Sequence, residues 1–380
     1  MKIREICNRT GVSLGLLQPG PLNAITDVSG VRVGHSTIIC EGNVPDERVR
    51  TGVTVVIPCD DIVKNSVTAG YFSQNGNGEF TGCHWMDEAG FLSTPIALTN
   101  THSVGVVRDA MISYYREKIP NFVPEWMLPA VAETWDGWLS NIFSMSVTAQ
   151  HVYEALDTAS SGPVAEGCVG GGTGMILHEF KGGIGTSSRV TSSESGGYTV
   201  GVLVQGNCGK RQDLTIAGVP LGRFLPTGLI SGKSEQGDPG KGDTGSIIVI
   251  IGTDAPLSSD QCRRLARRAT LGLARTGGIC GNGSGDIFAA FSTAHRFREG
   301  IQHSYDVTVL SSDCMDELFR ATVESTHEAI ANAMSAAVPM SGIKGRFMSA
   351  LPLDRVENIF RRYGELEADI CRCAGIGYVE

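Results

Sequence analysis

Short apolar runs, each bounded by glycine or polar residues, recur along the chain and predict a fold rich in short β-strands. The runs are β-branched or aromatic, and several are apolar at consecutive positions rather than at alternate ones. Consecutive apolar positions are typical of strands in a sheet that is covered on both faces. The predicted strands are 52–58, 94–100, 198–206, 245–253 and 286–294.

Three further segments have helical periodicity. Ser258 and Gln261 form a capping-box pattern before a run with apolar residues at helical spacing, and two glycines at 277–278 end it. Helices are also predicted over 315–337 and around 149–160. Because strands and helices interleave without a regular βαβ alternation, the sequence predicts a layered α+β fold.

Glycine is unusually abundant, with 49 among 380 residues and no collagen-like period. The glycines gather in clusters such as 75–82, 166–175 and 180–189, which predict tight turns and close backbone approach. The polar, glycine-rich stretch 227–243 is predicted to be a flexible exposed loop rather than a domain boundary. With no internal repeat, residues 1–380 are predicted to form a single domain.

Composition narrows the classes of function. Apolar residues make up 41% and charged residues 19%, and the net charge of −9 argues against nucleic acid as a partner. The longest aliphatic run, 247–251, is too short to cross a membrane, and the first residues lack the apolar core of a signal peptide. Eleven cysteines without C-x-x-C spacing fit neither a disulfide scaffold nor a zinc site, and the histidines show no metal spacing. We therefore expect a cytoplasmic protein with reduced cysteines and no metal.

The stretch "GGICGNGSGDIFAAFSTAH" (277–295) places Ser284 among glycines, directly before a predicted strand. A nucleophile elbow, G-x-S-x-G, does not fit, because Asn282 and Asp286 stand where it needs glycine. A phosphate-binding loop does not fit either, because the stretch lacks the lysine that would complete it. A glycine-rich turn into a strand, without chemistry, remains one interpretation.

A self-generated N-terminal nucleophile is the other interpretation of Ser284. Gly283 has no Cβ, so the hydroxyl can approach its carbonyl and the backbone can hold a strained conformation. Attack moves the acyl group from nitrogen to oxygen and leaves an ester that water hydrolyses. The new chain starts at Ser284, whose α-amine has a reference pKa of about 7.7–8.0 and can act as the general base.

Several glycine-rich motifs, in this order, resemble the DmpA-type aminopeptidases, which are L-aminopeptidase/D-Ala-esterase/amidases and close kin of the β-peptidyl aminopeptidases. The matches cover most of the chain. They are "GPLNAITDVSGVRVGH" (20–35), "NGNGEFTG" (75–82), "LTNTHSVG" (98–105), "VAETWDGWL" (131–139), "VGGGTGM" (169–175), "FKGGIGTSSR" (180–189) and "GNGSGDIFAAFSTA" (281–294).

The resemblance implies an αββα four-layer sandwich of the N-terminal-nucleophile type. It also implies self-cleavage into 1–283 and 284–380, with the two pieces associated in a homo-oligomer of processed protomers. The implied reaction is release of an N-terminal residue from short peptides, amides or esters, with no cofactor. Two alternatives stay open: an acyltransferase similar to the ornithine acetyltransferases, which use threonine at the cut, and an inactive binding protein with the same fold.

By resemblance, Ser284 is the nucleophile and Gly283 the residue before the cut. Asn207 matches the oxyanion-hole asparagine, although a turn residue after the 198–206 strand is the plain alternative. Glu133 matches the carboxylate that holds the substrate's amino group, because an aminopeptidase needs an anion for the free ammonium. Trp135 falls where relatives carry tyrosine or an aliphatic residue, so we assign it to the pocket wall.

The resemblance also points to a support for the nucleophile on the predicted helix 315–337. Glu324 matches a supporting glutamate, with Thr322 as a hydroxyl relay and Ser325 as the other candidate for the relay. Residues two apart on a regular helix point in nearly opposite directions, so both would reach Ser284 only if the helix bends. His327 stands where relatives carry an acid and is not expected to be an essential base.

Overall fold

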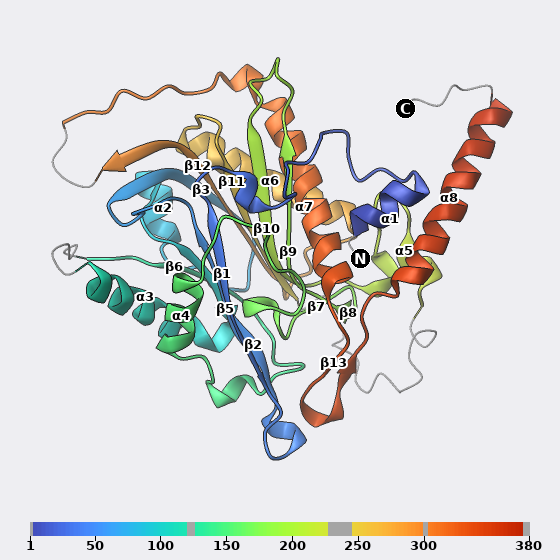
Figure 1. The fold of residues 1–380 in the computed structure, drawn as a ribbon, viewed down its shortest axis with the longest axis horizontal. Coiled ribbons are helices and arrows are strands. Elements are labelled where there is room, and N and C mark those ends of the chain that lie inside the picture. The colour runs from blue at the N-terminus through green and yellow to red at the C-terminus, as the bar shows by residue number, and fades with distance from the viewer. Residues whose placement is uncertain (1–2, 120–125, 227–244, 299–302, 375–380) are drawn as a thin grey trace.

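The computed structural model describes residues 3–119, 126–226, 245–298 and 303–374, so the predicted loop 227–243 lies outside the described residues. Two β-sheets lie face to face at the centre of the molecule, and helices cover their outer faces (Figure 1). The predicted α+β class and the αββα sandwich are confirmed by this layering.

The larger sheet has six strands and the smaller has four, and each sheet has one parallel pair, β11–β12 and β5–β6. The larger sheet runs β4 (Phe91–Leu92), β3 (Asn65–Gly76), β12 (Gly285–Arg298), β11 (Ser246–Thr253), β10 (Thr199–Asn207), β9 (Gly183–Val190). The smaller sheet runs β1 (Arg32–Cys40), β2 (Val49–Ile57), β5 (Ile96–Asn100), β6 (Ala130–Thr134).

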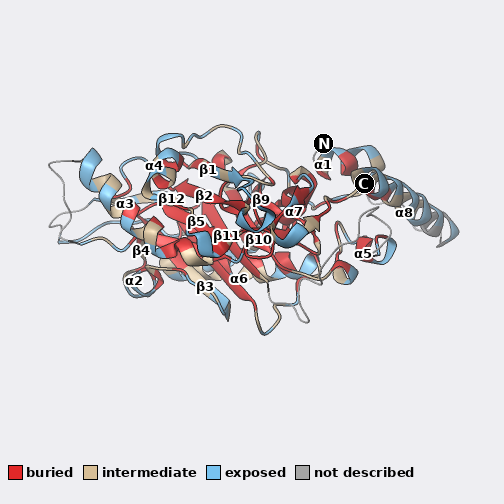
Figure 2. Cartoon of the chain, turned by 90° about the horizontal axis from the view of Figure 1, so that it is seen from below, coloured by how far each residue is buried: buried red, intermediate tan, exposed pale blue. Residues whose placement is uncertain are grey.

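Two pairs of helices form the outer layers. Helices α6 (Ser259–Arg275) and α7 (Asp316–Ala336) pack on the larger sheet, and α3 (Val104–Lys118) and α4 (Ala149–Asp157) pack on the smaller one. Helices α1 (Ile3–Thr10) and α8 (Leu353–Ala374) pack together at one end, and most of α8 is exposed (Figure 2). The short elements are α2 (Cys83–Ala89), α5 (Leu221–Phe224) and the hairpins β7 (Ile176–Leu177) with β8 (Phe180–Lys181) and β13 (Met340–Ser341) with β14 (Phe347–Met348).

The consecutive apolar residues of the strands belong to two separate hydrophobic cores, one on each face of the larger sheet. In β10, Val202 and Val204 belong to the core under α6 and α7, whereas Leu203 belongs to the core between the sheets. Strands β11 and β12 alternate in the same way, with Phe288 facing the helices and Ile287 facing the other sheet. Side chains alternate across a strand, so a sheet that is covered on both faces needs apolar residues at every position.

The capping box predicted for Ser258 and Gln261 is present at the start of α6. Ser258 Oγ accepts the Gln261 N–H at 3.3 Å, and Gln261 Oε1 accepts the Ser258 N–H at 3.0 Å. The cluster 180–189 forms strands β8 and β9 rather than turns alone. The predicted close approach of backbones is present, because β9 and α7 nearly touch at Gly185. A Cβ at Gly185 would lie 1.9 Å from the Ala329 carbonyl oxygen of α7.

Within the described ranges, no helix is both long and apolar enough to span a bilayer. None of the ten cysteines described there is in a disulfide. Seven of them are buried or half-buried, where a thiol behaves as a small apolar group.

Candidate active site

Ser284 lies directly before β12. In the larger sheet, the ends of β3 and β10 lie beside the starts of β11 and β12, and the edge that these strand ends form is where Ser284 lies. Gly285, the first residue of β12, pairs with Ser246 of β11 and with Gly76 at the end of β3. Ser246 in turn pairs with Asn207, the last residue of β10. Adjacent strands are about 4.8 Å apart, so the backbones of Asn207 and Gly285 lie about 10 Å from each other.

The Ser284 hydroxyl is buried and already has an acceptor. The residue is 1% exposed, and its Oγ donates to Asp286 Oδ1 at 2.8 Å. The Ser284 N–H donates to the Gly281 carbonyl at 2.9 Å, which closes a tight turn over 281–284. The uncut chain therefore holds the hydroxyl in one place, immediately beside the peptide bond that precedes it.

Two asparagines at the end of β3 bind the turn before Ser284. Asn77 Nδ2 donates to the Gly283 carbonyl at 2.7 Å. Asn75 Nδ2 lies 2.7 Å from the Cys280 carbonyl oxygen and 3.1 Å from Asp286 Oδ2. The turn is thus fixed by side chains from a strand about 200 residues earlier in the sequence.

Asn207 faces the space between the two sheets. Its side-chain Oδ1 accepts the Ile176 N–H at 2.8 Å, and its Nδ2 donates to the Trp135 carbonyl at 2.8 Å. A carboxamide has two N–H donors, and the second donor of Asn207 has no acceptor among the residues that the structure describes. The Asn207 amide is therefore fixed in orientation, and one of its N–H groups is available to donate a hydrogen bond.

Glu133 lies on β6, where the smaller sheet meets the same edge. Its Oε1 accepts the Glu79 N–H at 3.0 Å, and its Oε2 accepts the Thr101 hydroxyl. Burial raises the pKa of the carboxyl, against the hydrogen bonds from Thr101 and Glu79, which lower it. A Cβ at Gly78 would lie 3.1 Å from Glu133 Oε1 and 3.4 Å from the Gly285 Cα, so the carboxylate and the start of β12 border the same small space.

Trp135 and Asp136 follow β6 directly and differ in exposure. Trp135 is 42% exposed, and its indole lies against Gly137, where it forms part of the surface next to Asn207. Asp136 is completely buried behind it, and burial raises the pKa of its carboxyl to about 7. The site is therefore an edge with one exposed aromatic ring, the buried carboxyl groups of Glu133 and Asp136, and one amide donor.

Residues 23–348 of the chain match peptidase family S58. The chain belongs to this family. It is 43% identical over 363 residues to the β-peptidyl aminopeptidase BapA of Sphingosinicella microcystinivorans. The aligned residues cover 92% of this chain and 91% of that relative.

Solved structures of similar proteins agree with this S58 assignment. A β-aminopeptidase of a Burkholderia species has a TM-score of 0.86 at 45% identity, covering 95% of this chain and 99% of the other. The L-aminopeptidase D-Ala-esterase/amidase of Ochrobactrum anthropi, described as a new variant of the Ntn hydrolase fold, has a TM-score of 0.85 at 40% identity, covering 96% and 99%. The predicted family and the predicted aminopeptidase are confirmed, and the acyltransferase and binding-protein alternatives are not favoured.

In this S58 peptidase, the structure brings Ser284, Glu133, Trp135 and Asn207 to one edge but does not bring Glu324 there. Glu324 Oε2 bonds to Arg189 Nε at 3.3 Å. Arg189 of β9 lies opposite Val200 of β10, and Val200 lies opposite Thr253 of β11. Thr253 in turn lies opposite Ser292 of β12. Ser292 is eight residues beyond Ser284, or about 26 Å along the strand.

The role predicted for Glu324 and Thr322 beside the nucleophile is therefore corrected. Glu324 Oε1 accepts the Leu16 N–H at 3.0 Å, so this carboxylate holds the N-terminal segment. Thr322 Oγ1 donates to the Leu318 carbonyl at 2.8 Å within α7. His327 is buried, its Nε2 accepts the Ala217 N–H at 3.1 Å, and burial lowers the pKa of its ring to about 4.

Sequence reasoning missed Asp286, although a signal for it was present. Ser284 and Asp286 are two residues apart at the start of a strand, and a period of two places side chains on the same face. The same period links Asn75 and Asn77 in the motif at 75–82. What the sequence does not contain is the register that sets the end of β3 beside the start of β12.

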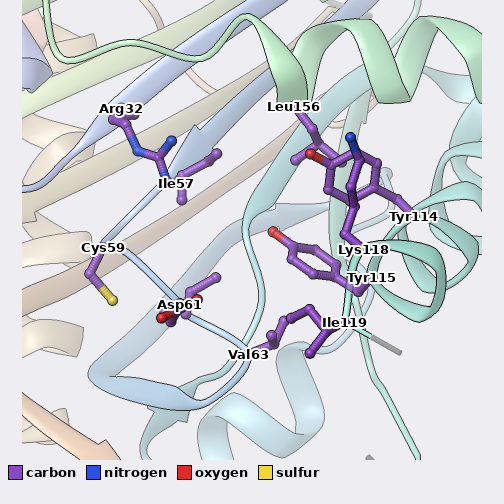
Figure 3. Close-up of a pocket in the computed structure, with 11 residues that line it drawn as sticks. Arg32, Ile57, Cys59, Asp61, Val63, Tyr114, Tyr115, Lys118, Ile119 and Leu156 are labelled. Atoms are coloured by element: carbon purple, nitrogen blue, oxygen red, sulfur yellow. The ribbon is translucent and has the colours of Figure 1, made fainter. Parts of the chain in front are cut away.

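A separate pocket of about 270 Å³ lies at the opposite end of the smaller sheet, lined in part by Arg32, Ile57, Tyr115 and Lys118 (Figure 3). Ile57 pairs with Arg32 at one end of that sheet, whereas Glu133 pairs with Thr99 towards the other. This pocket is therefore not part of the candidate active site.

Proposed function

We propose that this S58 peptidase works through Ser284 as an N-terminal nucleophile, made by cleavage of the chain between Gly283 and Ser284. The observation that carries the proposal is the buried Ser284 hydroxyl, held directly after a glycine at the edge that Glu133 and Asn207 share. Cleavage gives Ser284 a free α-amine with a reference pKa of about 7.7–8.0. That amine is the general base for the hydroxyl of its own residue.

The reaction we propose is release of an N-terminal residue from short peptides, amides or esters. Glu133 binds the free ammonium of the substrate, which restricts hydrolysis to chain ends. The unused N–H of Asn207 donates to the developing oxyanion, and Trp135 forms the wall of the pocket. Because several similar proteins are named β-peptidyl aminopeptidases or β-aminopeptidases, we include N-terminal β-residues among the substrates, besides L-residues and D-Ala.

We further propose that the processed protomers assemble into homo-oligomers in the cytoplasm. Support for assembly comes from large apolar side chains on the surface, among them Phe143 at 82% and Leu16 at 75% exposure. Support for the compartment comes from the free, exposed thiols of Cys40 and Cys314, which a reducing environment maintains.

Intact mass under denaturing conditions tests the nucleophile. Wild-type protein is expected as two pieces, 1–283 and 284–380, and Ser284→Ala as one chain without peptidase activity. Hydrolysis of p-nitroanilides with N-terminal L-, D- and β-residues measures the reaction, and N-acetylated substrates are the control for Glu133. A wild-type chain that stays whole and is fully active would refute the proposal.

A further inference from the structure

We propose that Asn77 and Asp286 carry out the self-cleavage step, Asn77 as the donor to the scissile carbonyl and Asp286 as the acceptor of the Ser284 proton. The proposal rests on the self-cleavage proposed above and assigns that step to residues other than those that act on substrates. Its basis is a pair of hydrogen bonds to the two atoms that react: Asn77 Nδ2 to the Gly283 oxygen, and Ser284 Oγ to Asp286 Oδ1.

The sheet aims these two side chains at one peptide bond. The register between β3 and β12 shifts at Asp286, where Asn75 lies opposite Asp286 but Ser73 lies opposite Ile287. One extra residue of β3 forms a bulge there, and bulges re-aim the side chains that follow them. The end of β3 also lies very close to β12, since a Cβ at Gly285 would be 2.4 Å from the Asn77 carbonyl oxygen.

The turn before the cut is held in place for the same step. Asn75 donates to the Cys280 and Gly281 carbonyls and to Asp286. It therefore links the carboxylate that takes the proton to the backbone that carries the scissile bond. A fixed carboxylate and a fixed donor cost no reorganisation when the reaction occurs.

The chemistry balances with water as the only other reactant. Ser284 Oγ bonds to the Gly283 carbonyl carbon while its proton passes to Asp286, and Asn77 donates to the oxygen that becomes negative. The C–N bond then breaks, and the Ser284 nitrogen takes the proton back from Asp286. This leaves an ester between the Gly283 carbonyl and Ser284 Oγ. Water hydrolyses the ester to a Gly283 carboxylate and a free Ser284 hydroxyl; Asn77 is exposed, so water reaches this point.

Asp286 and Asn207 lie on different faces of the larger sheet. Asp286 shares its strand face with Phe288, which packs under the helices. Asn207 shares its face of β10 with Leu203, which packs between the sheets. In the uncut chain the hydroxyl is bonded on the helix-covered side, so cleavage, which frees the backbone of Ser284, is what lets the hydroxyl serve the side with Asn207.

The test is the rate of self-cleavage of the full-length chain, followed on denaturing gels after cell-free synthesis. Asn77→Ala removes the donor, and Asn77→Asp replaces the N–H by an oxygen without changing the size of the side chain. Each is expected to slow cleavage about 10- to 100-fold. Asp286→Asn keeps the shape but removes the base and is expected to slow it about 100-fold or more. Asn65→Ala, at the other end of β3, is the matched control and is expected to cut like wild type.

A second measurement separates this step from peptide hydrolysis. Once the Asn77 variants have been cut, their kcat per cut chain is expected within about threefold of wild type, because Asn77 does not act on the substrate. Cleavage of both Asn77 variants, or of Asp286→Asn, at the wild-type rate would overturn the inference. If instead wild type itself is never cut, it is the proposed nucleophile that fails.

Discussion

Replacing Asp136 by asparagine is expected to stabilise the protein at neutral and alkaline pH and to remove part of its pH dependence. The Asp136 side chain is completely buried, and burial raises the pKa of its carboxyl from 3.8 to about 7. Thr51 and Asn100 favour the charged form but do not outweigh burial, and Glu133 raises the pKa further. Lys181 is also buried and interacts with Asp136, and burial lowers the pKa of its ammonium to about 8.

The magnitude follows from proton linkage. The unfolded chain releases the Asp136 proton near pH 3.8, whereas the folded protein holds it until about pH 7. Between these values the folded state binds more protons, so the free energy of unfolding falls as the pH rises. Each pKa unit corresponds to about 1.4 kcal/mol, so the full shift of about three units corresponds to about 4 kcal/mol, and to about 2 to 3 kcal/mol between pH 5 and pH 8.

Urea unfolding at pH 5 and pH 8 measures the effect, with Ser284→Ala as the background so that a single chain unfolds. The stability of Asp136→Asn relative to its parent is expected to improve by about 2 to 3 kcal/mol from pH 5 to pH 8. Asp109→Asn, on the exposed surface of α3, is the control and is expected to show no such change. A stability difference for Asp136→Asn that is the same at both pH values would refute the reasoning.

Three further changes test the site. Glu133→Gln is expected to raise KM at least about tenfold with little change in kcat, because a charged partner of the substrate ammonium is lost. In wild type, KM is expected to rise as the pH falls, because protonation removes the charge of Glu133. The rise is expected to begin above 4.5, the ordinary pKa of a glutamate, because burial raises the pKa of Glu133. Gly78→Ala is expected to raise KM as well, since the new methyl lies 3.1 Å from Glu133 Oε1; an unchanged KM would contradict this geometry. Glu324→Ala is expected to cost about 1.5–3 kcal/mol in urea unfolding, because the buried Arg189 loses one of its two carboxylate partners and keeps Glu328. Its kcat is expected to stay within about twofold of wild type, and a large loss of kcat in folded protein would support the catalytic role predicted from the sequence.

Strands with apolar residues at every position could be predicted from the sequence, and strands with mixed composition could not. The predicted strand 245–253 corresponds to β11 (Ser246–Thr253), whose residues are buried throughout. In contrast, six of the eight residues of β9 (Gly183–Val190) are glycine, serine, threonine or arginine, yet the strand is almost completely buried. Its burial is imposed by α7 and the N-terminal segment, which no local pattern records.

The residues of the site divide in the same way. Glu133 and Asn207 could be placed through motifs that resemble a family, and the structure sets both at the edge with Ser284. Asp286 could have been found by strand alternation. Asn77 could not, because its position depends on the antiparallel register of β3 on β12 and on the bulge in it. A contact of this kind, across about 200 residues, is a property of the sheet and not of any local segment.

Helix α7 shows why spacing along a helix does not decide which end of a sheet a side chain serves. Arg189 is fully buried and bonds to Glu324 and to Glu328, the latter at 2.8 Å, and Glu328 also binds Arg4 of the N-terminal helix. Burial by itself would raise the pKa of Glu328, but the two guanidiniums outweigh it and lower the pKa. These charges are paired, so they hold the N-terminal segment to the sheet and offer no free base. This cluster lies about eight residues along β12 from Ser284, so it stabilises one end of the sheet, whereas the reactions that we propose take place at the other end.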